Sequence, residues 1–429
     1  MKINDLAIIS AQLILLFIIS VGCGIGFNDI SRGGGEIGAI FSIFMALFCI
    51  FNILLISNSE NYADSLIKLS PFFVFAVNFG LIIGLADLPF KDSPLWVPDS
   101  YDQHIPTSLL FTDLLKTGNL DFFSKLHVYL TSLFVGFGFF LFGTTPVVSA
   151  MVLTFVKAAS IAISRNAWKS IFEGKVVAVG FVIYLLSPQI IFHTIVFFRE
   201  ATIHLLVALN FVCLINYVRN GFSWGRLVCV GLAILLVANE RFYLGVFFSI
   251  AYIGYSFFNI RGFSRKIFFI PVIVFIGGII FYYLTESLGS IIRFSSPLES
   301  LSDYRDLHEG LVGGDSGGSI ITGIIRLLFA PYVTAEKFST YSGLSHLITW
   351  GSIYNLIFTV FFIFGCFYLT RYFNKRMFFV LSLAYFLNLL MWGYIAPFNF
   401  RIRDSFYLFF SMFSAFAVMK IIDGLKKIK

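Results

Sequence analysis

Long apolar runs, separated by short clusters of charge, glycine and proline, dominate the chain from end to end. Each run approaches the roughly 20 residues that a helix needs to cross a bilayer. The pattern predicts an all-α, polytopic membrane protein with about twelve transmembrane helices, in a single domain over residues 1–429. The predicted spans are 7–26, 37–57, 68–86, 145–163, 175–192, 201–218, 226–239, 242–258, 267–285, 345–370, 377–396 and 404–421.

Charges between the runs predict which side of the membrane each loop faces. Basic residues gather in four short loops and in the tail, which the positive-inside rule assigns to the cytoplasm together with both termini. These loops are 164–175, 219–226, 261–266 and 371–376. Two large loops, 87–144 and 286–344, then face the periplasm of a bacterial inner membrane. One predicted cytoplasmic loop, 58–67, runs against the rule because it carries Glu60 and Asp64.

The apolar stretch 127–143 is the main ambiguity of the first large loop. A full span here would move the basic loop 164–175 to the outside, against the charge rule. We therefore expect 127–143 to be an interfacial or re-entrant segment on the outer leaflet, so that the outer loops contain short interfacial helices.

Composition supports a membrane environment. The chain is 58% hydrophobic and only 12% charged, so it has too few charges to cover a water-facing surface. Its net charge of +7 comes from residues in inter-span loops, so membrane lipids are expected as partners and nucleic acid is not. The five cysteines lie in apolar runs without CxxC spacing, which predicts neither a disulfide framework nor a metal cluster.

Polar residues next to outer span ends are the candidates for chemistry, because charge is costly inside a membrane. The first cluster, after the third span, contains Asp99, Tyr101, Asp102 and His104. Two carboxylates and a histidine can supply a general base or hold a divalent cation, and no other cofactor is indicated. The alternative is a solvated turn in which Asp99 caps the following helix.

Three further clusters lie on the predicted outer side. Arg199 and Glu200 open a span, where they can form a structural ion pair or present a guanidinium and a carboxylate to one cavity. Glu240 and Arg241 occupy a tight turn between two short spans, and a simple turn role is the alternative.

The last cluster contains Arg401, Arg403 and Asp404 before the final span. Its two arginines oppose the positive-inside bias, which favours binding of phosphate or pyrophosphate. Acidic side chains and arginines at one surface suit a lipid whose phosphate head group is handled outside the bilayer. A transporter is expected to bury ionisable groups near mid-membrane, and here Lys157 is the main such group. This scarcity argues against an ion-coupled carrier.

The order of several short motifs carries a family resemblance. The motifs are Asp99-Ser100-Tyr101 with His104, Leu141-Phe142-Gly143, Leu186-Ser187-Pro188 and Phe198-Arg199-Glu200. Over about residues 95–260 the chain resembles the GT-C class of glycosyltransferases, which take sugars from polyprenyl-phosphate carriers. It looks closest to the protein mannosyltransferases and the aminoarabinose transferases of lipid A. It departs from them in having Asp-Ser where many members have two adjacent acids.

The resemblance implies a GT-C-like helix bundle with a catalytic acid in the first outer loop. Asp99 matches that acid and would deprotonate or orient the acceptor hydroxyl, and Glu200 matches a second acid at the start of a later span. Tyr101 would pack against the sugar or prenyl chain. The residues expected to stabilise the departing lipid phosphate are Arg199, Arg401 and Arg403.

The expected function is therefore glycosyl transfer from an undecaprenyl-phosphate-linked or undecaprenyl-pyrophosphate-linked sugar in surface polysaccharide assembly. An O-antigen or capsule repeat-unit polymerase is favoured over a transferase that adds one sugar to a lipid-linked glycan. A flippase or transporter of lipid-linked glycans is the alternative from a different class. Other polysaccharide-assembly proteins are candidate partners.

Overall fold

The computed structural model describes residues 3–28, 34–85, 95, 104–118, 129–221, 223–259, 324, 328, 346–372, 382–391 and 404–427. All regular structure among these residues is helical, as the sequence predicts. The helices are α1 (Ile3–Asn28), α2 (Gly34–Asn58), α3 (Glu60–Gly84), α4 (Ile105–Thr117), α5 (Leu130–Phe142), α6 (Pro146–Lys169), α7 (Gly174–Leu185), α8 (Pro188–Ile195), α9 (Glu200–Asn220), α10 (Trp224–Glu240), α11 (Phe242–Asn259), α15 (His346–Tyr372) and α18 (Tyr407–Lys426).

Seven described helices are long and apolar enough to cross a membrane, and the bent pair α7–α8 is an eighth candidate. The seven are α1, α2, α3, α6, α9, α15 and α18. The described chain thus has the architecture of a polytopic membrane protein.

The predicted count of twelve spans is not confirmed. Two predicted spans, 226–239 and 242–258, correspond to α10 and α11, whose 17 and 18 residues make them shorter than any of the seven. The described part of predicted span 377–396 is the short helix Ser382–Met391. Predicted span 267–285 lies outside the described residues.

The predicted span over 175–192 corresponds to the bent pair α7–α8, and its break was not predicted. The chain bends by 61° between α7 and α8. Pro188 has no backbone N–H to continue the helix, and it disfavours a helical conformation of the residue before it. Ser187 accordingly has an extended backbone with φ −67° and ψ 115°. The break places the side chains of α8 inside the bundle.

The predicted boundary of the third span is also corrected, because α3 begins eight residues earlier than expected. The Ser59 hydroxyl accepts a hydrogen bond from the backbone N–H of Tyr62 and caps the helix start. Segment 58–67 is therefore largely helical, and Asp64 forms an ion pair with Lys169 at 2.7 Å. The acid that runs against the charge rule thus faces a basic partner.

The chain divides into two compact units. Unit 1 comprises Met1–Val212, Pro331–Tyr372 and Asp404–Lys429, and unit 2 comprises Cys213–Ala330 and Phe373–Arg403. Within unit 1, α3 packs against α1, α6 and α7, and α18 packs against α7 and α15. Within unit 2, α10 packs against α11.

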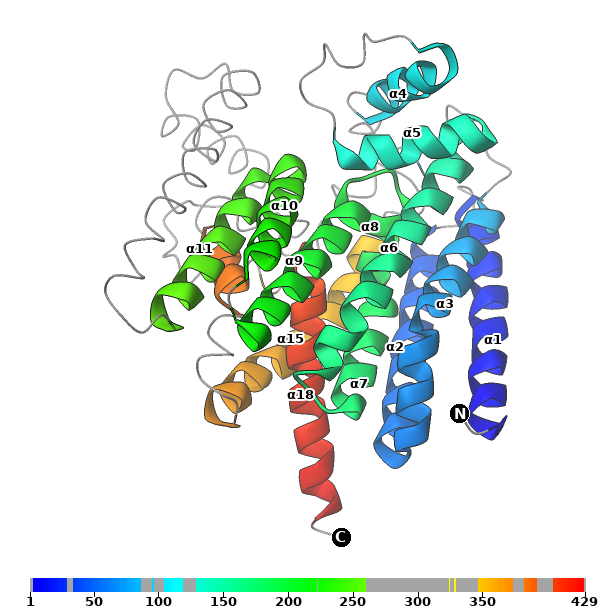
Figure 1. The fold of residues 1–429 in the computed structure, drawn as a ribbon. Helices are drawn as coiled ribbons and strands as arrows, with labels where there is room; N and C mark the ends of the chain where they lie inside the picture. The colour runs from blue at the N-terminus through cyan, green and yellow to red at the C-terminus, as the bar shows by residue number, and fades with distance from the viewer. Residues whose placement is uncertain are drawn as a thin grey trace, which may run out of the picture. The chain divides into compact units, whose positions relative to one another are not determined.

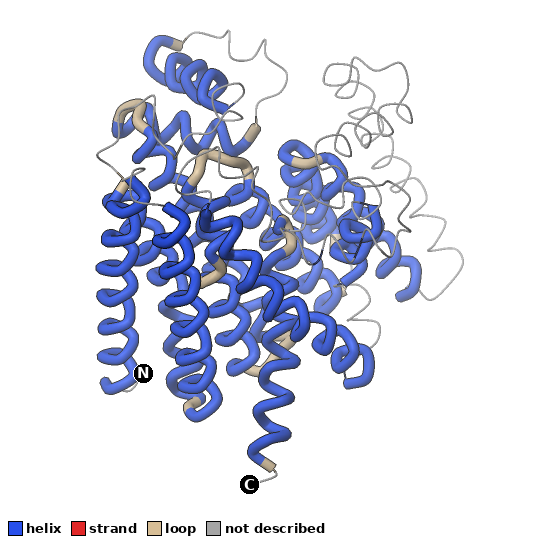
Figure 2. The backbone as a smooth tube through the Cα atoms, turned by 180° about the vertical axis from the view of Figure 1, so that it is seen from behind, coloured by secondary structure: helices blue, strands red, loops and turns tan. Residues whose placement is uncertain are grey.

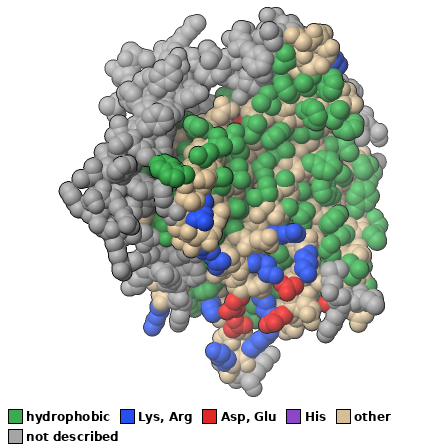
Figure 3. Space-filling view, viewed as in Figure 1, with side chains coloured by type: hydrophobic (Ala, Val, Ile, Leu, Met, Phe, Trp, Pro, Cys, Tyr) green, Lys and Arg blue, Asp and Glu red, His purple; other side chains and the backbone are tan. Residues whose placement is uncertain are grey.

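The two ends of unit 1 differ in character (Figures 1 and 2). Helices α4 and α5 lie at one end, and both chain termini lie at the other. At the terminal end, Lys175 and Lys426 both donate to the carbonyl oxygen of Ser57, which closes the C-terminal turn of α2. Charged side chains visible in Figure 3 gather toward the end of α18, whereas hydrophobic side chains cover much of the remaining described surface.

The 13-residue helix α5 runs across the ends of the long helices (Figure 1). Its length of about 20 Å is less than the roughly 30 Å of a hydrocarbon core. It is thus too short to be a full span, and its location in the outer leaflet stays a prediction.

Candidate functional site

The sequence-predicted site residues fall into three groups. Asp99, Tyr101, Asp102, Arg401 and Arg403 lie outside the described residues. His104, Arg199 and Glu200 belong to unit 1, and Glu240 and Arg241 belong to unit 2.

In unit 1, two of the predicted clusters meet through aromatic contacts. His104, which precedes α4 and is only 3% exposed, packs its ring 5.6 Å from that of Phe197 and 5.4 Å from that of Tyr129. The guanidinium carbon of Arg199 lies 4.4 Å from the centre of the Tyr129 ring, within cation–π range. The start of α4 and the start of α9 are therefore held together beside α5.

A backbone contact strengthens this junction. The N–H of Phe197 donates to the carbonyl oxygen of Leu95 at 2.9 Å, and both residues are buried. Leu95 and His104 are the described residues on either side of segment 96–103. Both therefore contact Phe197, two residues before Arg199.

The junction rests on an apolar core shared by four elements. Its buried members are Ile105, Val135, Phe139, Val148, Leu153, Val156, Phe197 and Ala201. Because these residues come from α4, α5, α6 and the start of α9, burial of their apolar area fixes the four elements relative to one another.

Glu200 is the first residue of α9 and is fully buried. A carboxylate is favoured electrostatically at a helix N-terminus, where the backbone dipole presents partial positive charge. His204 lies one turn later on the same face of α9. A buried acid within a membrane bundle is a candidate for function because burying its charge is costly.

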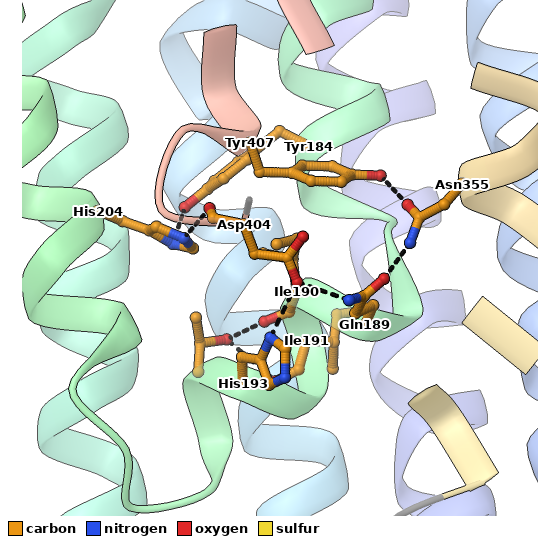
Figure 4. Close-up of polar contacts among 10 residues, drawn as sticks. Tyr184, Gln189, Ile190, Ile191, His193, His204, Asn355, Asp404 and Tyr407 are labelled. Carbon is orange, nitrogen blue, oxygen red and sulfur yellow. Dashed lines mark hydrogen bonds and ion pairs between the residues drawn. The ribbon is translucent and has the colours of Figure 1, made fainter. Parts of the chain in front are cut away.

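Unit 1 also contains a buried polar network that sequence reasoning did not identify (Figure 4). The Gln189 side-chain N–H donates to Asp404 Oδ2 at 2.6 Å, and His193 Nδ1 lies 3.2 Å from the same oxygen. Asn355 donates to the Gln189 carbonyl oxygen and accepts from the Tyr407 hydroxyl. All five side chains are fully buried, and they link α8, α15 and the start of α18.

His204 extends this network to α7. Its Nε2 lies 2.8 Å from the backbone carbonyl oxygen of Asp404, and its Nδ1 lies 2.8 Å from the Tyr184 hydroxyl. Because a carbonyl oxygen only accepts, Nε2 must carry a proton. In the neutral ring, Nδ1 then accepts from Tyr184, so both imidazole nitrogens have partners.

Lys157 lies near the middle of α6 and is fully buried. It donates to the Thr194 hydroxyl at 3.2 Å and lies 5.6 Å from the centre of the Tyr184 ring. Other buried ionisable side chains in the described part of unit 1 include His193, His204, Glu200 and Asp404. Glu200 opens α9 and Asp404 lies just before α18, so the argument against a transporter from scarce mid-span charge stays an expectation.

In unit 2, Glu240 is the last residue of α10 and Arg241 lies between α10 and α11. Glu240 and Arg241 are 2% and 9% exposed, and Arg241 donates to the Tyr243 hydroxyl at 3.0 Å. Their burial is greater than a simple surface turn requires.

Among the described residues, no group of three or more His, Cys, Asp or Glu side chains could hold a metal ion. A divalent cation at Asp99 and Asp102 stays a prediction. A cavity of about 10 Å³ beside Tyr184 and His204 has room for at most one water molecule.

Comparison of the chain with models of known protein families, with curated proteins and with solved structures gives no match.

Proposed function

We propose that this chain is a membrane glycosyltransferase that acts on a sugar linked to undecaprenyl phosphate or pyrophosphate. The reaction would take place at the end of unit 1 where α4 and α5 lie. The observation that carries the proposal is the convergence of the two flanks of segment 96–103 on Phe197, directly before Arg199 and the buried Glu200. That arrangement suits an acid from the first loop acting together with a guanidinium and a second acid.

In the proposed reaction, Asp99 or Asp102 accepts the proton of the acceptor hydroxyl. The hydroxyl oxygen attacks the anomeric carbon and forms the new glycosidic bond. The bond between that carbon and the lipid phosphate breaks, and the phosphate leaves with the bonding electrons. Arg199 stabilises the developing negative charge. The same role for Arg401 and Arg403 stays a prediction.

Within this class, we favour a polymerase that joins lipid-linked repeat units of a surface polysaccharide at the periplasmic face of a bacterial inner membrane. A transferase that adds a single sugar is the close alternative. A flippase is a second candidate from another class, and it is favoured by the buried ionisable groups next to the bent α7–α8 pair.

Gene disruption separates these functions. Surface glycan from a disrupted strain, complemented with wild type, Asp99→Asn or Glu200→Gln, is compared on a gel. Loss of long chains with single repeats retained identifies a polymerase, and a small shift in mobility identifies a single-sugar transferase. Loss of all surface glycan identifies a flippase.

The matched control is Glu173→Gln, which neutralises an exposed acid before α7. It should complement like wild type. Full complementation by both Asp99→Asn and Glu200→Gln, at wild-type protein levels, would refute the proposed enzymatic site.

A further inference from the structure

The segment that carries Arg199 has little regular structure of its own. Residues 196–199 form a bend between α8 and α9, and Val196 has an extended backbone with φ −74° and ψ 145°. Such a bend lacks the continuous hydrogen bonds of a helix, so its geometry depends on how the two flanking helices are held.

Asp404 binds both flanking helices. Its side-chain carboxylate accepts from Gln189 and contacts His193 on α8. Its backbone carbonyl oxygen accepts from His204 on α9. Figure 4 shows Asp404 between the two histidines, which come from the elements before and after the bend.

We propose that Asp404 is a positioning residue that fixes Arg199 and Glu200 by clamping α8 and α9 on either side of them. This inference rests on the proposed glycosyl transfer at Glu200. Asp404 touches no reacting atom in this scheme. It acts through the two helices, and the contact between Gln189 and Asn355 anchors the clamp to α15.

Full burial makes the clamp sensitive to single substitutions. Each partner of the Asp404 carboxylate is buried, so water cannot replace a lost hydrogen bond. The contacts of Asp404 with the two helices can also be changed separately. Asp404→Asn alters the side-chain contacts with α8 but leaves the backbone carbonyl oxygen that binds His204.

The test is amide hydrogen exchange of the full-length protein in lipid nanodiscs, together with the surface-glycan gel. Asp404→Asn should speed exchange in peptides covering 196–204 by about tenfold and reduce glycan assembly. Asp423→Asn, which neutralises an exposed acid on the same helix α18, should change neither. Unchanged exchange in 196–204 would overturn the clamp, whatever the gel shows.

A second pair of variants distinguishes loss of the contact with Asp404 from general misfolding. His193→Asn retains a side-chain N–H donor near the position of Nδ1, whereas His193→Leu removes it. Exchange should stay near wild type in His193→Asn and rise in His193→Leu. Equal exchange and equal glycan assembly in these two variants would contradict the proposal.

The two proposals fail in different ways. The positioning role alone is overturned if Asp404→Asn speeds exchange but leaves glycan assembly normal, while Glu200→Gln abolishes assembly. Normal glycan in both Glu200→Gln and Asp99→Asn overturns the proposed enzymatic site, and the positioning role fails with it. Exchange in 196–204 still reports whether the clamp exists.

Discussion

Two helix contacts within unit 1 are held together by opposite means. Helices α1 and α3 meet through small residues: Gly24 lies against the backbone of Leu81 and Gly84, and Gly80 lies against Ser20. The contact between α8, α9 and the start of α18 is instead made by buried polar side chains around Asp404. The first relies on close backbone approach and the second on hydrogen bonds between buried side chains.

This difference predicts how each contact can be broken. Close packing of small residues fails when atoms are added, because there is no space for a side chain. A buried polar network fails when a partner is removed, because the remaining groups lose their hydrogen bonds without gaining water. The polar contact costs more to assemble in an apolar environment, which is a reason to seek function there.

The largest effect is expected for Asp404→Ala. It removes the acceptor of the Gln189 hydrogen bond and the carboxylate that His193 contacts, and each buried polar group left without its partner costs about 1–3 kcal/mol. The measurement is the thermal unfolding midpoint of the purified protein in detergent, with exposed Asp423→Ala on the same helix as control. Equal midpoints for the two variants would show that the Asp404 network contributes no stability.

A smaller loss is expected for Gly24→Val. A Cβ atom at Gly24 would lie 2.6 Å from the Leu81 carbonyl oxygen, so α1 and α3 must separate. Overpacking of this kind costs about 1–3 kcal/mol. Gly22→Val is the matched control, because a Cβ atom there meets nothing within 4 Å. If the two variants unfold at the same temperature, close α1–α3 packing is not required.

Tyr184→Phe should have a modest effect. It removes the hydroxyl that binds His204 but keeps the ring near Lys157, and loss of one such hydrogen bond costs about 0.5–1.5 kcal/mol. The thermal midpoint should fall by less than in Asp404→Ala. A larger fall than in that variant would reverse the order of importance within the network.

The smallest effect is expected at the charged end of unit 1. Lys169 and Asp64 form their ion pair with side chains 38% and 53% exposed, so solvent screens the attraction. Asp64→Asn should cost about 0.5 kcal/mol or less, and high salt should reduce the difference from wild type. A salt-independent loss comparable to that of Asp404→Ala would contradict this explanation.

Sequence patterns could predict the helical class and most long spans, because long apolar runs indicate helices surrounded by the hydrocarbon of a bilayer. They also singled out Glu200, since an acid at a span end is conspicuous. The bend at Pro188 was missed because the apolar residues on both sides of Ser187, Pro188 and Gln189 together are long enough for one span. The charge pattern identified segment 58–67 as an exception to the positive-inside rule, but it did not indicate that Asp64 pairs with Lys169.

The polar network could not be predicted because its members are ordinary residues until the fold brings them together. Gln189 and Asp404 are 215 positions apart in the sequence. One local signal was present: Gln189 and His193 lie four residues apart, directly after Pro188, and therefore share a face of α8. Nothing in that spacing indicates that Asp404 is their partner.

Mass spectrometry of lipid-linked glycans tests the central claim most directly, by comparing disrupted cells complemented with Glu200→Gln or Glu173→Gln. We predict that Glu200→Gln cells accumulate undecaprenyl-linked single repeat units, whereas Glu173→Gln cells match wild type. The same glycan distribution in both strains, at equal protein levels, would contradict a role for buried Glu200 in glycosyl transfer.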